Sequence, residues 1–351
     1  MNIKNRRPRY FINSLAPIRI CDNGGWTDTW FAEHGEIFNI AVAPFAEVQI
    51  AVYERMEREA QVIINAENFG DRYAVNPDKG PGRHPLLEAA IAIMSIPDDI
   101  SIEVTIYSEA PAGASTGTSA AVTVALIGAL DFLSPGRMNK HEVASTAHKI
   151  ETEILGQESG VQDQLCSAYG GINYIQMHQY PQASASQIEV PDDLLWELER
   201  RLVLIYLGRS HSSSRVHEMV IQSLEQAGPE CQQLNDLRAT ARKSRDAIVN
   251  GDLHALGLAM IENTEAQRRL HPELVSDDAC RVIEIASEHA ASGWKVNGAG
   301  GEGGSVTILN NAFLDLKQPM LRKIESENSL YRIIPVRLAR SGLRVWKQNW
   351  R

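Results

Sequence analysis

A run of small and hydroxyl-bearing residues gives this chain a candidate site for a polyphosphate. Residues 111–133 read PAGASTGTSAAVTVALIGALDFL, so glycines and hydroxyls lead directly into a long apolar segment. A strand-like segment, residues 102–107, precedes the run, and the pattern predicts a strand, a loop and a helix in that order. Amides in the first turn of a helix lack partners within it, and the helix dipole favours negative charge there. The residues expected to line this anion site are Pro111, Gly113, Ala114, Ser115, Thr116, Gly117, Thr118 and Ser119.

Two well-known phosphate-binding loops do not match this run. No lysine follows Gly117, as the GxxxxGK[ST] loop requires, and the glycines do not have the GxGxxG spacing. A P-loop ATPase and a dinucleotide-dependent dehydrogenase are therefore disfavoured. An ordinary turn between a strand and a helix remains the alternative, because glycine-rich loops are common.

A second cluster of polar residues lies near the start of the chain. Residues 16–28 read APIRICDNGGWTD, and the Asn-Gly-Gly sequence in it predicts a sharp turn. Such a turn would bring Arg19 and Asp28 near one cavity. A plain β-turn with an arginine and an aspartate on the surface is the alternative.

Two acidic residues mark a third candidate segment. Residues 140–155 place apolar side chains on one face and predict an amphipathic helix that contains Glu151. The polar segment that follows, residues 156–173, contains Asp163. Taken singly, a glutamate on a helix and an aspartate in a loop are usually solvated.

A second run of glycines and a basic cluster lie in the last part of the chain. Residues 295–309 read KVNGAGGEGGSVTIL, which excludes a helix or a central strand over the glycines and includes Gly300 and Gly301. An ordered connection between a helix and a strand is favoured over a flexible linker. After a predicted buried strand at residues 202–207, Arg209, His211 and Arg215 could bind a second anion at the start of a helix. A solvated helix N-terminus is the alternative.

The remaining elements indicate a mixed α+β protein. Residues 36–53 contain two strand-like runs on either side of Ala43-Pro44, and residues 253–270 predict a helix. The polar stretch 180–187, YPQASASQ, predicts a boundary region, with a strand-like run at 188–190.

Composition narrows the class of protein. A chain of 351 residues with 44% hydrophobic residues can bury a large core and is expected to form two domains. A net charge of −10 disfavours nucleic acid as a partner. The four cysteines are scattered without a CxxC pair, and no apolar run has the length of a membrane span. We therefore expect a cytoplasmic protein with neither a membrane nor a nucleic-acid partner.

Taken together, these motifs resemble those of the GHMP kinases, a family of small-molecule kinases for galactose, homoserine, mevalonate and phosphomevalonate. Their second motif, a proline followed by Gly-Leu-Gly-Ser-Ser-Ala, is matched from Pro111 by residues 115–120, with Thr116 and Thr118 as substitutions. Residues 16–28 are similar to the first motif in heptose-phosphate kinases and fucokinases. Residues 295–309 resemble the third motif, in which Glu302 is a departure.

The resemblance implies a fold and a reaction. It implies a ribosomal-protein-S5-like N-terminal domain over residues 1–200, a ferredoxin-like C-terminal domain over residues 201–351, and an active site between them. The cofactors would be ATP and Mg²⁺. The reaction would transfer the γ-phosphoryl group of ATP to the anomeric hydroxyl of a sugar, with D-glycero-D-manno-heptose 7-phosphate as the expected acceptor. Fucose or another free sugar is the alternative acceptor.

The resemblance also implies a role for each candidate residue. Asp163 would orient or deprotonate the acceptor hydroxyl, Arg19 would stabilise developing charge, and Ser119 and Glu151 would hold Mg²⁺. Residues 111–119 with Gly300 and Gly301 would bind ATP. The acceptor would be bound by Asp28, Gly24, Gly25 and Trp26, and its phosphate by Arg209, His211 and Arg215.

Two other classes of protein share these motifs. A catalytically silent protein that binds nucleotide and sugar would keep the loops and lose the transfer, but retention of both Asp163 and Arg19 disfavours it. A decarboxylase of the mevalonate branch would have the same fold. The Gly-Gly-Trp-Thr-Asp segment favours a sugar over that substrate.

Overall fold

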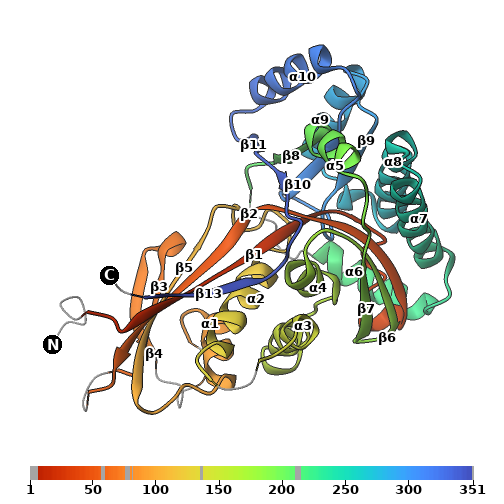
Figure 1. Cartoon of the computed structure of the whole chain (residues 1–351). Coiled ribbons are helices and arrows are strands. Elements are labelled where there is room, and N and C mark those ends of the chain that lie inside the picture. Colours follow the sequence, from red (N-terminus) through yellow and green to blue (C-terminus); the bar gives the residue numbers. More distant parts are fainter. Residues whose placement is uncertain are drawn as a thin grey trace.

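The chain folds into two β-sheets with helices packed against them (Figure 1). The computed structural model describes residues 7–56, 60–75, 80, 82–134, 137–209 and 215–349. Within these residues, one sheet has nine strands and the other has four. All pairs of neighbouring strands in these residues but one are antiparallel, and the helices pack on the sheets, which confirms the predicted α+β class.

Two long antiparallel strands form the centre of the large sheet. They are β1 (Tyr10–Asn23) and β2 (Gly35–Glu54). The first part of β2 pairs with β6 (Ile172–Gln179), and the last part pairs with β5 (Ile100–Ser108). The prediction of two separate runs around Ala43-Pro44 is therefore wrong. Pro44 has no amide hydrogen to donate, and it is tolerated because it lies between the β6-paired and β5-paired parts of one strand.

The rest of the large sheet comes from distant parts of the chain. The strand β5 pairs in parallel with β3, and β3 pairs with β4. Late strands return to this sheet, where β12 pairs with β2 and β13 pairs with β1. The bounds of these strands are Val62–Ala66 for β3, Asp71–Val75 for β4, Arg337–Leu338 for β12 and Arg344–Asn349 for β13. The division into domains at residue 200 stays a proposal, in which residues 337–349 would lie against the first domain.

The polar stretch around residue 185 is a strand, contrary to the predicted boundary region. Residues Gln182–Gln187 form β7, which pairs with β6 as a hairpin, whereas residues 188–190 are not in a strand. Ala183 and Ala185 face the core while their neighbours are exposed. The alternation that specifies a strand is thus present in small side chains, which a search for large apolar residues overlooks.

The small sheet has the strand order β11-β8-β10-β9 with antiparallel neighbours throughout. Read in chain order this is 4-1-3-2, the order of the predicted ferredoxin-like layer. Two helices, α9 and α10, cover this sheet through one apolar cluster. The bounds are Leu202–Tyr206 for β8, Gly293–Val296 for β9, Ser305–Leu309 for β10, Arg332–Ile334 for β11, Asp277–Glu288 for α9 and Leu314–Glu327 for α10.

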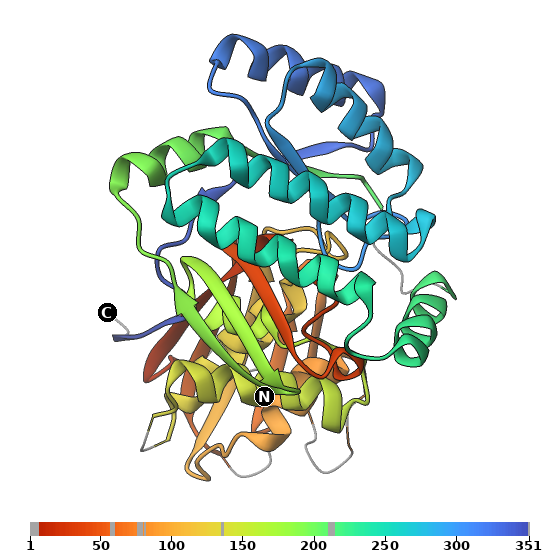
Figure 2. The ribbon, with the colours of Figure 1, turned by 90° about the vertical axis from the view of Figure 1, so that its right-hand side faces the viewer.

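Two long helices connect the sheets. Figure 2 shows α7 (Gln232–Val249) and α8 (Leu253–Leu270) lying side by side between them. The helix α8 has the predicted bounds. The helix α7 contacts β1 and β2, while α8 contacts β1 and β9. The other helices of this region are α5 (Asp192–Arg201) and α6 (Arg215–Ala227).

Four helices cover one face of the large sheet. The most buried is α2, whose alanine, valine and leucine side chains fill the centre of the main core. None of the helices in the described ranges is long and apolar enough to cross a membrane. The bounds of the four are Pro85–Ile93 for α1, Thr118–Asp131 for α2, Lys140–Lys149 for α3 and Gln162–Tyr169 for α4.

Candidate active site

The glycine-rich loop joins β5 to α2, as the sequence predicts. Gly117 precedes the helix with a φ of 68°, a conformation that favours glycine. A Cβ atom at this position would lie 3.1 Å from the carboxyl carbon of Asp163. Gly117 is therefore required both for the turn and for the close approach of the aspartate. The N-terminus of α2, with its free amides, begins beside that carboxylate.

The structure brings together Arg19 from β1 and Asp163 from the first turn of α4. The guanidinium donates from Nε to Oδ1 of Asp163 at 2.8 Å and from Nη2 to Oδ2 at 3.2 Å. Its Nη1 donates to the backbone carbonyl of Ser115 in the glycine-rich loop. Burial alone would lower the pKa of Arg19, but Asp163 and Asp22 raise it above its usual value. The arginine stays charged next to the loop.

Two cavities meet at this pair. One, of about 760 Å³, is lined by the glycine-rich loop and by an apolar wall. The other, of about 600 Å³, is lined by residues of the 16–28 turn and of the 156–163 loop. The residues common to both are Arg19, Asp163, Gly298 and Ala299. A molecule in either cavity would therefore contact the same arginine and aspartate.

Asp28 is buried in the wall of the second cavity. Its Oδ2 accepts a hydrogen bond from the backbone amide of Gln162 at 3.0 Å. A Cβ atom at Gly160 would lie only 2.1 Å from the same oxygen, so only glycine fits there. Burial raises the pKa of Asp28 to about 6, and the nearby carboxylate of Asp163 contributes to the increase.

The raised pKa makes Asp28 costly for folding. Its value of about 6 lies above the ordinary 3.8, so ionisation above pH 6 destabilises the folded chain, and this cost disappears as the pH falls toward 4. We expect Asp28→Asn to raise the melting temperature at pH 8 by roughly 2–4 °C. The gain should fade between pH 6 and pH 4, in thermal denaturation followed at each pH. The surface variant Asp246→Asn should give no such pH-dependent gain, and an equal gain at pH 4 and pH 8 would contradict the assignment.

Glu151 lies on a local widening of the helix that begins at α3. The predicted helix over 140–155 ends as an α-helix at Lys149, and residues Ile150–Ile154 form a π-helical turn. This turn directs Glu151 into the protein, where its Oε2 accepts hydrogen bonds from Ser159 at 2.7 Å and Gln164 at 2.8 Å. Burial raises its pKa to about 7, and Asp163 adds to that effect.

The residues that line the two cavities include Ser119 but not Glu151, so the binding of a divalent cation by this pair stays a prediction. Among the described residues no lysine or arginine pairs with Glu151, so the buried carboxylate lacks a positive partner. Ser119, the other predicted ligand, is exposed in the first turn of α2 and lines the first cavity. Mg²⁺ prefers such hard oxygen ligands, usually with few protein groups and several waters or phosphate oxygens.

We expect Glu151→Gln to raise the Mg²⁺ concentration needed for half-maximal activity by about tenfold or more, because a neutral amide is a weaker ligand. The measurement is a titration of initial rate against free Mg²⁺ at saturating ATP. Glu153→Gln, at a neighbouring exposed glutamate, is the matched control and should not change the requirement. An unchanged requirement in Glu151→Gln would make this residue structural.

The second glycine-rich run, which follows β9, packs directly on the first. Cβ atoms at Gly298 and Gly304 would lie 2.9 Å from Cβ and from Oγ of Ser115, respectively. By contrast, Gly300 and Gly301 contact the turn after α8, where the amide of Gly301 donates to the carbonyl of Leu274 at 2.9 Å. Gly298 and Gly304 therefore make the contact with the loop, and a role for Gly300 and Gly301 in ATP binding stays a prediction.

The Gly-Gly-Trp segment shapes the second cavity, which Gly25 and Trp26 line. Gly24 has a φ of 90°, and a Cβ atom there would lie 2.0 Å from the carbonyl oxygen of Glu36. Trp26 is buried and contacts the ring of His217 in α6 edge to face at 5.7 Å. The turn thus presents an aromatic wall to whatever occupies this cavity.

The predicted second anion site is only partly described. His211 lies in residues 210–214, outside the described ranges. Arg209 and Arg215 are both exposed, and neither is among the residues that line the two cavities. The carbonyl of Arg209 accepts from the amide of Gly304 at 3.2 Å, which places its backbone beside the second glycine-rich run. Binding of an acceptor phosphate by these residues stays a prediction.

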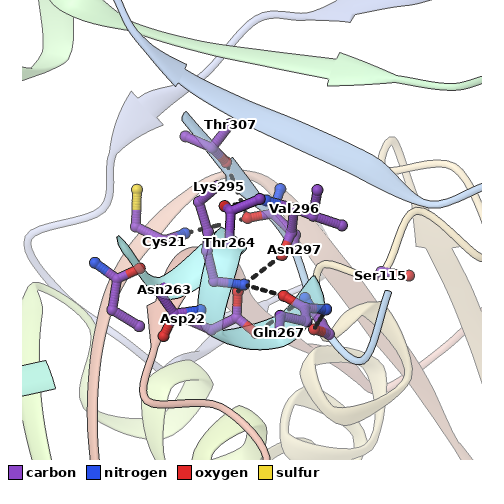
Figure 3. A network of polar contacts seen from close by, with 12 residues as sticks. Cys21, Asp22, Ser115, Asn263, Thr264, Gln267, Lys295, Val296, Asn297 and Thr307 are labelled. Atoms are coloured by element: carbon purple, nitrogen blue, oxygen red, sulfur yellow. Dashed lines mark hydrogen bonds and ion pairs between the residues drawn. The ribbon is translucent and has the colours of Figure 1, made fainter. Parts of the chain in front are cut away.

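Sequence reasoning missed several residues of the site. The apolar wall of the first cavity comes from segments without a motif, and its side chains are Phe69, Leu86, Leu87 and Tyr107. Asp22 and Lys295 form a buried ion pair (Figure 3). Oδ2 of Asp22 lies 4.0 Å from Nη2 of Arg19. Asp22 lies in segment 16–28 and Lys295 in segment 295–309, where the sequence analysis considered mainly the glycines. An aspartate and a lysine, each a few residues before a glycine run, were the available signal, because charged residues are rarely buried without a partner.

Comparison with known proteins places these features in a family. The model of the GHMP kinases N terminal domain matches residues 86–171, which include the glycine-rich loop, α2, Glu151 and Asp163. The chain carries a GHMP kinase N-terminal domain. Outside this match, the first and third GHMP kinase motifs line the same two cavities through Arg19, Asp28 and Gly298.

Relatives of this GHMP kinase domain are named for different acceptors, among them two sugars and mevalonate. The chain is 24% identical over 336 residues to a bifunctional fucokinase/GDP-fucose pyrophosphorylase of Arabidopsis thaliana. This alignment covers 90% of the chain and 32% of that protein. The chain is 24% identical over 206 residues to a D-glycero-alpha-D-manno-heptose 7-phosphate kinase of Campylobacter jejuni, covering 58% and 60%. The chain thus spans about a third and about three fifths of these two relatives.

A solved structure has the same GHMP kinase fold. It is a D-glycero-D-manno-heptose 1-phosphate kinase from Bacteroides thetaiotaomicron, with a TM-score of 0.72 and 20% sequence identity. The superposition covers 95% of this chain and 98% of that one. The two-domain GHMP kinase fold predicted from the motifs is therefore confirmed.

Proposed function

We propose that this protein is an ATP-dependent kinase that phosphorylates the anomeric hydroxyl of a sugar. The observation that carries the proposal is the meeting of two cavities at Arg19 and Asp163. One cavity has the loop amides that suit a polyphosphate, and the other has buried polar groups that suit hydroxyls. A γ-phosphoryl group at the junction would lie beside the arginine, and an acceptor hydroxyl beside the aspartate.

Each group of residues in the two cavities has its own role in the proposed phosphoryl transfer. Transfer requires positioning and charge neutralisation more than covalent chemistry. Loop amides and the N-terminus of α2 would hold the phosphates, and the apolar wall of Phe69, Leu86 and Tyr107 suits a purine ring. Asp163 would orient the acceptor hydroxyl or accept its proton, and Arg19 would stabilise the charge that develops. Mg²⁺, held by Ser119 and Glu151, would supply additional neutralisation of phosphate charge.

The expected acceptor is D-glycero-D-manno-heptose 7-phosphate, with the 1,7-bisphosphate as product. The Gly-Gly-Trp-Thr-Asp segment and the likeness to a heptose 7-phosphate kinase support this acceptor. Such an acceptor carries a phosphate and needs a second anion site. The candidates for that site are Arg209, His211 and Arg215.

Acidic residues next to the acceptor cavity favour the alternative acceptor, a neutral sugar such as fucose. A third cavity, of about 460 Å³, adjoins the acceptor cavity and shares Trp30, Gln157, Glu158 and Ile221 with it. Among the described residues, its lining includes three glutamates and neither lysine nor arginine: Glu158, Glu218 and Glu225. A phosphate on the far end of the acceptor would meet like charge there, whereas hydroxyl groups would find acceptors.

A panel of acceptors tests the reaction and the acceptor together. The protein is incubated with ATP, Mg²⁺ and one of heptose 7-phosphate, fucose, galactose, mevalonate or mevalonate diphosphate. ADP, the phosphorylated product and carbon dioxide are measured. We expect turnover with a sugar and phosphate on its anomeric oxygen. Transfer to no acceptor, with ATP still bound, would favour a silent binding protein, and release of carbon dioxide from a mevalonate diphosphate would favour a decarboxylase.

If the acceptor carries a phosphate, Arg209→Ala should raise its KM by about tenfold, the scale of one charge-assisted hydrogen bond. The KM of a neutral sugar should not change, because no phosphate contact is lost. Both values are measured by steady-state kinetics in the panel. Equal effects on the two sugars would remove Arg209 from the acceptor site, and preference for a free sugar would refute the heptose 7-phosphate assignment alone.

A further inference from the structure

A buried ion pair next to Arg19 was given no role in the proposed function. Lys295, in β9 of the small sheet, is 1% exposed, and its ammonium lies 3.4 Å from Oδ1 of Asp22 in β1. The ammonium also donates to Oε1 of Gln267 at 3.2 Å and to the carbonyl of Val296. Figure 3 shows the lysine directed between these groups. The pair joins the two sheets immediately next to the active site.

Asp22 extends this pair toward the catalytic groups. Its Oδ2 accepts a hydrogen bond from the amide of Gly298 at 2.9 Å. The same oxygen lies 4.0 Å from Nη2 of Arg19, whose Nε is 2.8 Å from Asp163. Arg19 therefore stands between two carboxylates. Arg19 donates hydrogen bonds to Asp163, while Asp22 forms an ion pair with Lys295.

A series of hydrogen bonds near Lys295 links β1 to the glycine-rich loop. The amide of Cys21 donates to Oδ1 of Asn297 at 3.3 Å, and the side-chain amide of Asn297 donates to Oγ of Ser305 at 3.0 Å. Ser305 in turn donates to the carbonyl of Ala114 at 2.6 Å. The strands on either side of Lys295 are thus tied to the glycine-rich loop, so the position of β9 affects the loop as well as Arg19.

We infer that Lys295 is a positioning residue for phosphoryl transfer, because its ammonium occupies Asp22 and so leaves Arg19 engaged with Asp163 and the Ser115 carbonyl. Without the ammonium, Asp22 would hold an uncompensated charge in the core, and Arg19 would be its cationic neighbour. A movement of the guanidinium toward Asp22 would take it from the place where the phosphoryl group develops charge. The inference rests on the proposed function, in which Arg19 acts on that group.

The experiment compares three variants with the unsubstituted chain by steady-state kinetics and thermal denaturation. Lys295→Met should lower kcat by about 100-fold, since small displacements of a positioned group have effects of that size. Both KM values should stay within about threefold, because ground-state contacts remain. In the double variant Asp22→Asn/Lys295→Met the competing charge is gone, and kcat should return to within about tenfold of the parent value. Lys317→Met, which removes a half-buried lysine bound to the carbonyl of Arg200, is the matched control and should leave kcat unchanged.

Several results would overturn the inference. One is a kcat of Lys295→Met within about threefold of the parent. Another is a double variant that regains its melting temperature but not its kcat, since Lys295 would then serve folding only. If Lys295→Met does not fold, the double variant decides: a kcat within about tenfold of the parent supports the inference, and a larger loss refutes it. A parent chain that phosphorylates no acceptor refutes the proposed function, and the position of Arg19 in a crystal structure of Lys295→Met then tests the inference.

Discussion

Asp163→Asn should lower kcat by about a thousandfold, within the range that a positioned acid or base contributes. The amide has the same shape as the carboxylate, so it fits against Gly117 and can still contact Arg19. It cannot accept a proton, and it holds the acceptor hydroxyl and the guanidinium less strongly. The affinity for ATP, measured by calorimetry without acceptor, should be nearly unchanged, because the phosphate-binding amides are intact.

The control for Asp163→Asn is the same substitution in a surface arginine–aspartate ion pair. Asp246 lies 2.8 Å from Arg245 and is well exposed, so Asp246→Asn should leave both kcat and ATP affinity as they are. A reduction of kcat by less than about tenfold in Asp163→Asn would exclude a general base. Orientation of the acceptor would then be the remaining role for this residue.

Arg19→Lys should lower kcat by about 100-fold or more, as expected when a donor to developing charge is lost. A lysine has no planar fork, so it cannot contact both oxygens of Asp163 and the carbonyl of Ser115 together. The positive charge is kept, which separates the loss of geometry from the loss of charge. Steady-state kinetics with saturating ATP and acceptor would measure the effect.

Two further variants sharpen this test. Arg281→Lys changes a half-buried arginine that pairs with Glu327 at 2.8 Å, and it should have no effect on kcat. The double variant Arg19→Lys/Asp163→Asn should lose less than the product of the single losses, since the two residues act as one unit. Fully multiplicative losses would show that the pair seen in the structure does not operate as a pair during transfer.

Much of the phosphate side of the site could be predicted from sequence because it depends on local backbone geometry. The loop that ends at Gly117, with a strand before it and a helix after it, is encoded by neighbouring residues, and the structure has these elements in the predicted order. The acceptor side depends on contacts between distant segments. The partners Arg19 and Asp163 could be proposed as neighbours only through the family resemblance, since nothing in their separate segments specifies the distance between them.

The failures of prediction have physical causes of the same kind. The turn at Glu151 is π-helical, and its effect is to direct one side chain inward without changing the apolar pattern of the helix. Lys295 appeared in sequence as one charged residue before a glycine run. Its burial follows from a partner in β1, which no local pattern reveals. A buried charged side chain needs a partner, and here that partner lies far away in the sequence. A local sequence pattern therefore does not predict the burial of either residue.

The pairing of β13 with β1 has a consequence for the synthesis of the chain. Among the described residues, the edge of β1 opposite β2 pairs only with residues 344–349, which cover residues 10–15. Every residue of the small sheet is translated before residues 344–349. While the ribosome is making α7 through β11, β1 therefore keeps an open row of backbone donors and acceptors. An open strand edge is the usual starting point for pairing with another chain. Nascent or truncated forms that lack β13 are thus the ones expected to require a chaperone.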